Sequence, residues 1–335
     1  MANRRDFLQT LALLTSGVML PWQGKASAED SIGEILPLRK LGNTGEEVTM
    51  LGLGGFHVGW TTLRDAQEVV ETAVELGIRF FDTAYSYGKG ASELRYGEYL
   101  VPKYREQVFI MTKSTAISYA TARQELEESL RRMKCDYVDL WQIHSLRSPK
   151  DVDGRIQNGV LKLAEEALKE GKAKYIGFTG HQNPYAHLRM LEQAGKSGLF
   201  STVQMPINVV DAGSYDSFIQ KVIPQALNYN LGVLAMKTLA DGRFFEQKHM
   251  KERQVWKTDN PVIPNYMSVE EALRFAWSLP ISVLITGAET ADLVREKVTF
   301  AKRLVNMSEE ERLALIAKMA KHVDGKRVEY YKKIT

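Results

Sequence analysis

Four polar side chains with complementary chemistry lie in the first half of the chain: Asp82, Tyr87, Lys113 and His144. When a carbonyl group is reduced, its oxygen gains negative charge, which a proton donor or hydrogen bonds must stabilise. A tyrosine hydroxyl has a pKa of about 10, and a nearby ammonium lowers that pKa because it favours the phenolate. A carboxylate keeps the lysine charged and oriented, and a histidine can hydrogen-bond the substrate oxygen. These residue types indicate a proton relay suited to reversible carbonyl reduction, with Tyr87 as the general acid.

Each of these residues has an ordinary structural role when it is taken alone. An Asp after a strand often caps a helix, a Lys is usually solvated, and a His is more often a satisfied core residue. Here, however, Asp82, Lys113 and His144 end three successive predicted strands, and Tyr87 follows Asp82 by five residues. The C-terminal ends of barrel strands meet at one mouth. A shared site is therefore the better interpretation.

The elements that position these residues are short apolar segments, which alternate with longer segments of helical periodicity. Short apolar runs are typical of buried parallel strands. Helical stripes such as Val69, Val70, Ala73 and Leu76 lie between them, and Gly77 is the expected C-cap of that helix. The predicted strands are Met50–Leu53, Arg79–Asp82, Val108–Lys113, Tyr137–His144, Lys174–Thr179, Thr202–Met205, Leu231–Met236 and Ser282–Ile285.

Two further features flank this alternation. Leu38–Val48 surrounds a turn signal and predicts a small hairpin. Two capping boxes, Ser268 with Glu271 and Ser308 with Glu311, predict the starts of late helices. The sequence therefore predicts an α/β fold, a (β/α)₈ TIM barrel with an N-terminal β-hairpin and an additional C-terminal helix, as one domain over residues 29–335.

An open doubly wound sheet is the main alternative architecture, and its Gly-rich phosphate fingerprint is not matched. Gly52, Gly54, Gly55 and Gly59 follow the first predicted strand, but no helix is expected directly behind them. We expect these glycines to let the chain pass close to a ligand at the barrel mouth. The longest irregular connection, 238–267, is interpreted as a lid or substrate wall, with a disordered insertion as the alternative.

Composition excludes few functions but argues against a polyanion partner. The chain has 335 residues and a formal net charge of +3, and it has no long block of like charge, so a nucleic-acid partner is not expected. The single cysteine, Cys135, cannot form an internal disulfide. No nucleophile-activating pattern surrounds Cys135, so it is interpreted as a packing or surface residue.

Residues 1–28 have the layout of an export signal. Arg4 and Arg5 precede a short apolar stretch, Leu8–Leu20, and the segment 26–28 reads Ala-Ser-Ala, a small-residue cleavage site. The apolar stretch is too short for a membrane span, so no stable membrane anchor is expected. Paired arginines before Phe-Leu resemble a twin-arginine signal, which predicts export by the twin-arginine machinery to the periplasm or beyond. An ordinary basic N-region is the alternative.

Residues 80–88, which read Phe-Phe-Asp-Thr-Ala-Tyr-Ser-Tyr-Gly, resemble the most distinctive signature of the aldo/keto reductases. Ser92-Glu93, Met111-Thr112-Lys113 and Ile143-His144 resemble further segments of the same family, and the resemblance runs from about Leu38 to Lys302. It implies the barrel, a small-molecule carbonyl substrate, NADP(H) rather than NAD(H) as cofactor, and no metal. It also implies the catalytic roles of Asp82, Tyr87, Lys113 and His144.

The resemblance also suggests which residues hold the nicotinamide. The family's Ser-Asn pair after the fifth strand aligns with Thr179 and Gly180, so only the hydroxyl is kept. Gln204 matches the glutamine that holds the carboxamide. Met236 stands in place of the stacking tyrosine, where a thioether can pack on the ring.

The phosphate side of the cofactor is assigned in the same way. Gly287 and Ala288 resemble the phosphate loop before the last barrel helix, and Glu296 matches the glutamate that contacts adenine. Family members that select the 2′-phosphate often carry basic residues where this chain has Gly287 and Leu293. The candidates for that charge here are Lys237, Arg243 and Lys297.

Two other functions remain compatible with the sequence. The same fold serves nucleotide-sensing regulatory subunits with little turnover, such as the potassium-channel β subunits, and fold alone does not separate them from enzymes. The second compatible function is that of a cofactor-free isomerase or lyase on the same barrel. The complete set of four catalytic residues favours the reductase, and Gln204 with the glycine loop before the last helix argues for a nucleotide.

Overall fold

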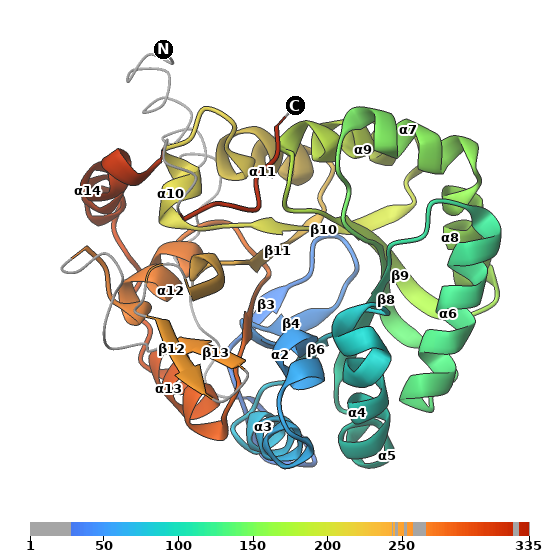
Figure 1. The fold of residues 1–335 in the computed structure, drawn as a ribbon, viewed down its shortest axis with the longest axis horizontal. Coiled ribbons are helices and arrows are strands. Elements are labelled where there is room, and N and C mark those ends of the chain that lie inside the picture. Colours follow the sequence, from blue (N-terminus) through green and yellow to red (C-terminus); the bar gives the residue numbers. More distant parts are fainter. Residues whose placement is uncertain are drawn as a thin grey trace.

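The structure is a computed structural model that describes residues 28–242, 244, 247–250, 253–256, 266–323 and 328–334. Eight parallel strands close into a barrel that helices surround (Figure 1). All the predicted strands are confirmed, each end within two residues of its expected place, and the fold is the predicted (β/α)₈ TIM barrel. The strands are β5 (Leu51–Gly54), β6 (Phe80–Asp82), β7 (Phe109–Ser114), β8 (Val138–Ile143), β9 (Ala173–Thr179), β10 (Phe200–Pro206), β11 (Gly232–Met236) and β14 (Val283–Gly287).

The helices outside the barrel form where apolar residues recur on one face. In α3 (Leu63–Glu75), the Thr62 hydroxyl accepts from the Asp65 amide, and Val69 is among the buried residues. Gly77 follows with φ +92°, so the predicted helix end is confirmed. The other helices are α2 (Gly55–Trp60), α4 (Ala91–Tyr99), α5 (Val101–Tyr104), α6 (Tyr119–Met133), α7 (Pro149–Gln157), α8 (Val160–Lys169), α9 (Pro184–Ser197), α10 (Val209–Ala212), α11 (Phe218–Asn228), α12 (Val269–Trp277), α13 (Ala291–Lys302) and α14 (Glu309–Met319).

Both predicted capping boxes are present, at Ser268 before α12 and at Ser308 before α14. Helix α14 is the predicted additional C-terminal helix. The N-terminal hairpin is also confirmed, as β3 (Leu38–Lys40) paired with β4 (Glu47–Thr49). It lies across the centre of the barrel in Figure 1.

The hairpin closes the N-terminal end of the barrel. Leu41 and Val48 are buried in the same cluster as the inward side chains of the strands, among them Phe80 and Val283. A second short pair, β1 (Ala28–Glu29) with β2 (Glu34–Ile35), precedes it. The closed N-terminal end leaves the C-terminal strand ends as the open mouth. Residues 1–27 of the proposed export signal lie outside the described residues, and its last residue, Ala28, begins β1.

The expectation that no helix follows the first barrel strand is wrong. Helix α2 begins at Gly55, directly after β5. A Cβ at Gly55 would lie 2.7 Å from the Ser92 hydroxyl, and one at Gly59 would lie 3.2 Å from the backbone nitrogen of Gly88. Protein atoms thus occupy the space that side chains would need. These glycines allow α2 to pack against the loop that carries Tyr87, instead of making room for a ligand.

The long connection after β11 also differs from the expectation of an irregular loop. It contains an antiparallel hairpin, β12 (Gln247–Met250) with β13 (Arg253–Trp256), and Phe244 is buried. Alternation between apolar and polar residues is weak in these short strands, so the sequence carried little signal for them. Arg243, one candidate for the cofactor phosphate, lies outside the described residues.

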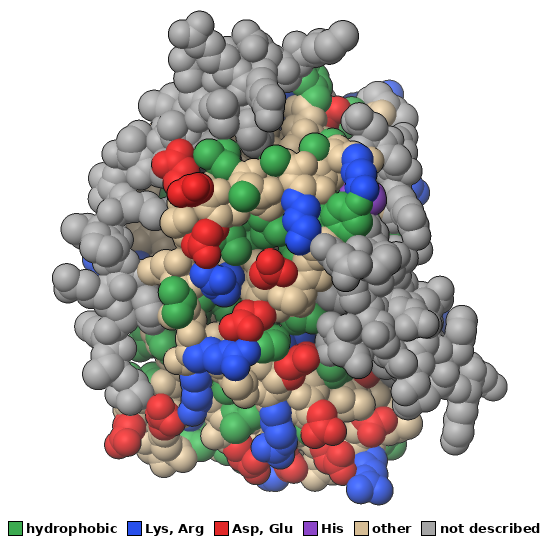
Figure 2. Space-filling view, turned by 90° about the vertical axis from the view of Figure 1, so that its left-hand side faces the viewer, with side chains coloured by type: hydrophobic (Ala, Val, Ile, Leu, Met, Phe, Trp, Pro, Cys, Tyr) green, Lys and Arg blue, Asp and Glu red, His purple; other side chains and the backbone are tan. Residues whose placement is uncertain are grey.

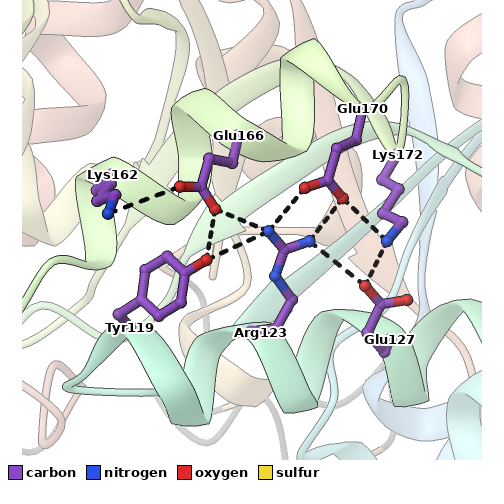
Figure 3. A network of polar contacts seen from close by, with 7 residues as sticks. All are labelled: Tyr119, Arg123, Glu127, Lys162, Glu166, Glu170 and Lys172. Carbon is purple, nitrogen blue, oxygen red and sulfur yellow. Dashed lines mark hydrogen bonds and ion pairs between the residues drawn. The ribbon is translucent and has the colours of Figure 1, made fainter.

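On the face drawn in Figure 2, basic and acidic side chains are interspersed. Between α6 and α8 they form a network (Figure 3), in which Arg123 donates to Glu166 at 2.8 Å and to both oxygens of Glu170 at 2.6 and 2.8 Å. Among the described helices, none is long and apolar enough to cross a membrane.

Burial raises the pKa of the Cys135 thiol to about 11, in keeping with the packing role expected from the sequence.

Candidate active site

The four residues predicted to carry the chemistry meet at the barrel mouth. Asp82 ends β6, Lys113 lies near the end of β7, and His144 directly follows β8. Lys113 Nζ contacts the Asp82 carboxylate, donates to the Thr83 carbonyl at 2.7 Å, and donates to the Tyr87 hydroxyl at 3.4 Å. The imidazole of His144 lies edge to face with the Tyr87 ring, with centroids 5.8 Å apart. The predicted juxtaposition of phenol, ammonium, carboxylate and imidazole is therefore present.

Asp82 and Lys113 form a deeply buried pair, with 4% and 1% of their surfaces exposed. Burial raises the pKa of Asp82 and lowers the pKa of Lys113, and the attraction between the two charges opposes both shifts. The close Lys113 contact and its additional hydrogen bond to Thr83 favour the charged pair. The ammonium is thus held beside the Tyr87 hydroxyl.

His144 is half-buried and neutral. Burial, together with the charges of Lys113 and other bases, holds the pKa of His144 well below its usual range. Its Nδ1 has no hydrogen-bond partner in the described part of the chain. A neutral imidazole can donate to a carbonyl oxygen without adding charge to the pocket.

The loop that carries Tyr87 is fixed from behind by Arg132 of α6. Its guanidinium donates to the Tyr85 carbonyl at 3.1 Å, lies 4.4 Å from the Tyr85 ring centroid, and pairs with Glu93 at 3.1 Å. Glu93 is fully buried and also accepts from the Thr112 hydroxyl at 2.6 Å, beside Lys113. Glu93 belongs to the Ser92-Glu93 segment that resembles the family, whereas no sequence pattern indicated Arg132, whose partners are distant in the chain.

Aromatic side chains of α2 line the approach to Tyr87. Phe56 packs edge to face on the Tyr87 ring at 5.4 Å and lies 6.1 Å from the Trp60 ring. Phe56 and Trp60 are 49% and 51% exposed, so they present an apolar surface to solvent beside Tyr87. They form an apolar wall at the entrance.

Two predicted nicotinamide residues present unsatisfied polar atoms to the mouth. Thr179 and Gln204 end up side by side on β9 and β10. Among the described residues, neither the Thr179 hydroxyl nor Gln204 Oε1 has a hydrogen-bond partner, although both are buried. The Gln204 side chain also hydrogen-bonds Asp82. Buried polar atoms are normally paired, so these two fit the amide of a bound carboxamide.

The remaining predicted cofactor residues lie on the neighbouring strands. Met236 ends β11, Gly287 ends β14, and Ala288 follows it buried. Glu296 lies on α13. Lys297 is buried, donates to the Gly287 carbonyl at 2.7 Å, and has its pKa lowered by that burial. Lys297 therefore brings a basic group to the predicted phosphate loop.

Lys237 differs from the other predicted cofactor residues. It directly follows β11 with φ +54°, a left-handed conformation that few non-glycine residues adopt. Its Nζ lies 5.0 Å from the centroid of the Tyr331 ring, which belongs to the C-terminal tail. Tyr331 was not singled out from the sequence.

A sequence profile of the aldo/keto reductase family matches residues 50–321. The chain belongs to the aldo/keto reductase family. Within the family, the L-galactose dehydrogenase of Arabidopsis thaliana is 30% identical over 226 residues, 63% of this chain and 68% of that protein. The 6-dehydroglucose reductase of Novosphingobium aromaticivorans is 28% identical over 77% of this chain and 88% of its own length. The NADH-specific methylglyoxal reductase of Escherichia coli is 24% identical over 85% of this chain and 98% of its own length.

A solved structure supports the fold. The holo form of the aldo-keto reductase AKR11C1 from Bacillus halodurans aligns with a TM-score of 0.68 and 21% identity, over 84% of this chain and 96% of that one. Membership of the family makes this aldo/keto reductase an NAD(P)H-dependent oxidoreductase that acts on carbonyl groups. The described residues hold no group of three or more His, Cys, Asp or Glu side chains arranged for a metal.

Proposed function

We propose that this aldo/keto reductase reduces an aldehyde or ketone to an alcohol, or catalyses the reverse reaction, with Tyr87 as the general acid. The observation that carries the proposal is the 3.4 Å contact between Lys113 Nζ and the Tyr87 hydroxyl, inside a buried cluster at the barrel mouth. When bound, NAD(P)H would supply the hydride. Tyr87 donates its hydroxyl proton to the carbonyl oxygen as negative charge develops there.

The neighbouring residues stabilise that proton transfer. The Lys113 ammonium stabilises the phenolate that remains on Tyr87, and Asp82 keeps the ammonium charged and in place. The neutral imidazole of His144 hydrogen-bonds the substrate oxygen and orients the carbonyl. Phe56 and Trp60 exclude water from one side of the pocket.

The same proposal assigns the cofactor contacts. Thr179 and Gln204 would hold the carboxamide, Met236 would pack on the nicotinamide ring, and the amides of Gly287 and Ala288 would bind phosphate. Glu296 would contact adenine. We favour NADP(H) over NAD(H), because the buried ammonium of Lys297 beside Gly287 fits a 2′-phosphate.

The test compares Tyr87→Phe with the wild-type enzyme under multiple turnover, using NADPH or NADH and a panel of aldehydes. We expect Tyr87→Phe to lower kcat by about 10³-fold or more, while calorimetry shows NADP⁺ binding within about 2-fold of wild type and tighter than NAD⁺. Phe is the matched variant because it removes only the hydroxyl. Full activity of Tyr87→Phe would remove Tyr87 from its role, and a wild-type burst limited to one turnover would favour the nucleotide-sensing alternative.

We also propose that the chain is exported by the twin-arginine route, with cleavage after Ala28. The support is the order of Arg4-Arg5, the apolar stretch and the Ala-Ser-Ala segment. A route that carries folded proteins suits an enzyme that acquires its nucleotide before export.

A further inference from the structure

The loop that carries Tyr87, residues 85–90, has an unusual backbone. Gly88, Lys89 and Gly90 have φ values of +59°, +57° and +94°, so three consecutive residues adopt the left-handed region. This conformation is costly for Lys89, because it has a Cβ. Strain of this kind persists only where surrounding contacts hold it, and it clusters at functional sites. The loop beside the proposed general acid therefore needs a support outside itself.

That support is Arg132, which reaches the loop from α6. Its guanidinium donates to the Tyr85 carbonyl at the start of the loop, at 3.1 Å, and lies over the Tyr85 ring. At the end of the loop, a Cβ on Gly90 would lie 2.6 Å from Arg132 Cζ, so the guanidinium occupies the space of that side chain. One planar group thus contacts both ends of the segment that contains Tyr87.

The guanidinium is itself fixed by two carboxylates. Arg132 donates to Glu93 of α4 at 3.1 Å and to Glu128, one turn earlier on α6, at 2.8 Å. Glu128 also accepts from the Tyr85 hydroxyl at 2.9 Å. Helices α4 and α6 pack against each other outside the barrel (Figure 1), so the pair of Arg132 with Glu93 links the helix that follows the loop to its neighbour.

Glu93 connects this ion pair to Lys113. Its carboxylate is fully buried and accepts from the hydroxyl of Thr112, the residue before Lys113, at 2.6 Å. Burial raises the pKa of Glu93, and the hydrogen bonds from Thr112 and Arg132 oppose that shift. Burial lowers the pKa of Lys113, and the charges of Asp82 and Glu93 oppose that shift in turn. Glu93 therefore helps to keep the catalytic ammonium charged.

Backbone contacts carry the position of Tyr85 to the reacting groups. The Tyr85 amide donates to the Lys113 carbonyl at 3.0 Å, and the Tyr87 amide donates to the Ala84 carbonyl at 3.0 Å. A shift of Tyr85 would therefore disturb the 3.4 Å contact between Lys113 Nζ and the Tyr87 hydroxyl. A displacement of about 1 Å between reacting groups can cost about 10²-fold in rate.

We propose that Arg132 and Glu93 form a clamp that positions the Tyr87 hydroxyl beside Lys113, so that both are positioning residues of the reaction. This inference rests on the proposed function, because it names what keeps the proposed general acid in place. Arg132 lies behind the loop, on α6, and acts through Tyr87. A buried ion pair adds little net stability compared with apolar residues of the same size. The geometry that the clamp imposes on the loop accounts for it better.

The kinetic test places Arg132→Met in the wild-type enzyme and in Tyr87→Phe. In the wild-type background we expect kcat to fall about 10- to 100-fold, with KM for the aldehyde and for NADPH within about 2-fold, because only the acid is displaced. In the Tyr87→Phe background the same change should lower kcat by less than about 2-fold, because no hydroxyl is left to position. An equal loss in both backgrounds would overturn the inference, since Arg132 would then act on something other than Tyr87.

Arg123→Met is the matched control. Arg123 also lies on α6, over a tyrosine ring, that of Tyr119 at 5.9 Å, and it also pairs with two glutamates. These contacts belong to the surface network of Figure 3 instead of the loop. Arg123→Met should therefore leave kcat unchanged.

A second variant separates the position of the loop from the charge of Glu93. Arg132→Met leaves Glu93 as an uncompensated buried carboxylate, which destabilises the fold. Adding Glu93→Gln removes that charge, and the amide oxygen can still accept from Thr112. This double variant should recover most of the Tm of wild type, but its kcat should stay low. Recovery of the wild-type kcat would show that Arg132 only neutralises Glu93, and it would overturn the inference.

Hydrogen exchange gives a readout that does not depend on turnover. The amides of residues 85–90, followed by mass spectrometry, should exchange about 10-fold faster in Arg132→Met than in wild type or Arg123→Met. Faster exchange in this loop, with no turnover of any carbonyl by wild type, would support the clamp and overturn the reductase. Unchanged exchange together with an unchanged kcat in Arg132→Met would overturn the clamp alone. Full activity of Tyr87→Phe would overturn both.

Discussion

At the scale of single residues, the site combines groups that burial would neutralise if they stood alone. Lys113 and Asp82 are each pushed towards the neutral form, yet together they keep an ammonium 3.4 Å from the Tyr87 hydroxyl. A buried pair of this kind contributes little net stability. Its place next to a phenol therefore points to a role in the reaction.

The first prediction concerns Lys113→Met. Without the ammonium, the phenolate form of Tyr87 loses its stabilising charge, so we expect kcat at neutral pH to fall by about 10²- to 10⁴-fold. We also expect the pH profile of kcat to shift or flatten across pH 5–10. An unchanged profile would contradict a role of Lys113 in the proton transfer.

Because Lys113→Met strands a buried carboxylate, it should also destabilise the protein by roughly 3–5 kcal/mol. The control is the double variant Asp82→Asn with Lys113→Met, in which the uncompensated charge is removed. Thermal unfolding should show that the double variant recovers most of the stability. If it also recovered activity, Lys113 would act only through the fold.

At the scale of elements, the sequence was informative where structure is local. The barrel strands are nearly continuous apolar runs, and the capping boxes at Ser268 and Ser308 require only residues three positions apart. The catalytic residues could be grouped because each ends such a strand. These features are determined within a window of a few residues.

Elements that depend on distant partners could not be predicted. Helix α2 is short, and its glycines are explained by the close approach of Asp82, Ser92 and Gly88. Tyr331 reaches the mouth because Lys332 pairs with Asp211, which lies 121 positions away in the chain. Arg132 contacts Tyr85 across 47 positions. No periodicity or motif in a single sequence indicates contacts of this range.

The second prediction concerns the α6–α8 network of Figure 3. Arg123, and after it Lys172, lower the pKa of Glu170 to about 2. A carboxylate whose pKa is lower in the folded state stabilises the fold above its unfolded pKa of about 4.3, and that contribution is lost as the pH falls towards 2. Arg123→Met should therefore lower Tm at pH 7 by about 2 °C but leave Tm near pH 2 unchanged.

Circular dichroism melts at several pH values would check this dependence. Arg64→Met is the matched control, because Arg64 makes a single exposed pair with Glu68 on α3. It should change Tm less than Arg123→Met at pH 7. A Tm difference for Arg123→Met that persists undiminished at pH 2 would show that packing of the Arg123 side chain is responsible instead of its charge.

At the scale of the whole molecule, the proposed site exists only after the barrel has closed. Its residues come from the end of β6 at one point of the chain and from α13 at the other, with β7 to β14 between them. A nucleotide that bridges Gln204 and the loop at Gly287 can therefore bind only to the folded chain. Export of a folded protein would let the enzyme carry its cofactor across the membrane.

The third prediction tests that route with Arg4→Lys plus Arg5→Lys, which preserves the charge of the N-region. We expect the double variant to remain in the cytoplasm at full length, whereas wild type is found in the periplasm, shortened at Ala28. Lys25→Gln is the control that removes a charge but keeps both arginines. Cell fractionation and mass determination give the result. Normal export of the lysine variant would identify an ordinary basic signal, which carries unfolded chains and would require the nucleotide to be acquired after export. The contact of Asp30 with Arg79, 2.6 Å long and just beyond the cleavage site, would be kept in the mature chain by either route.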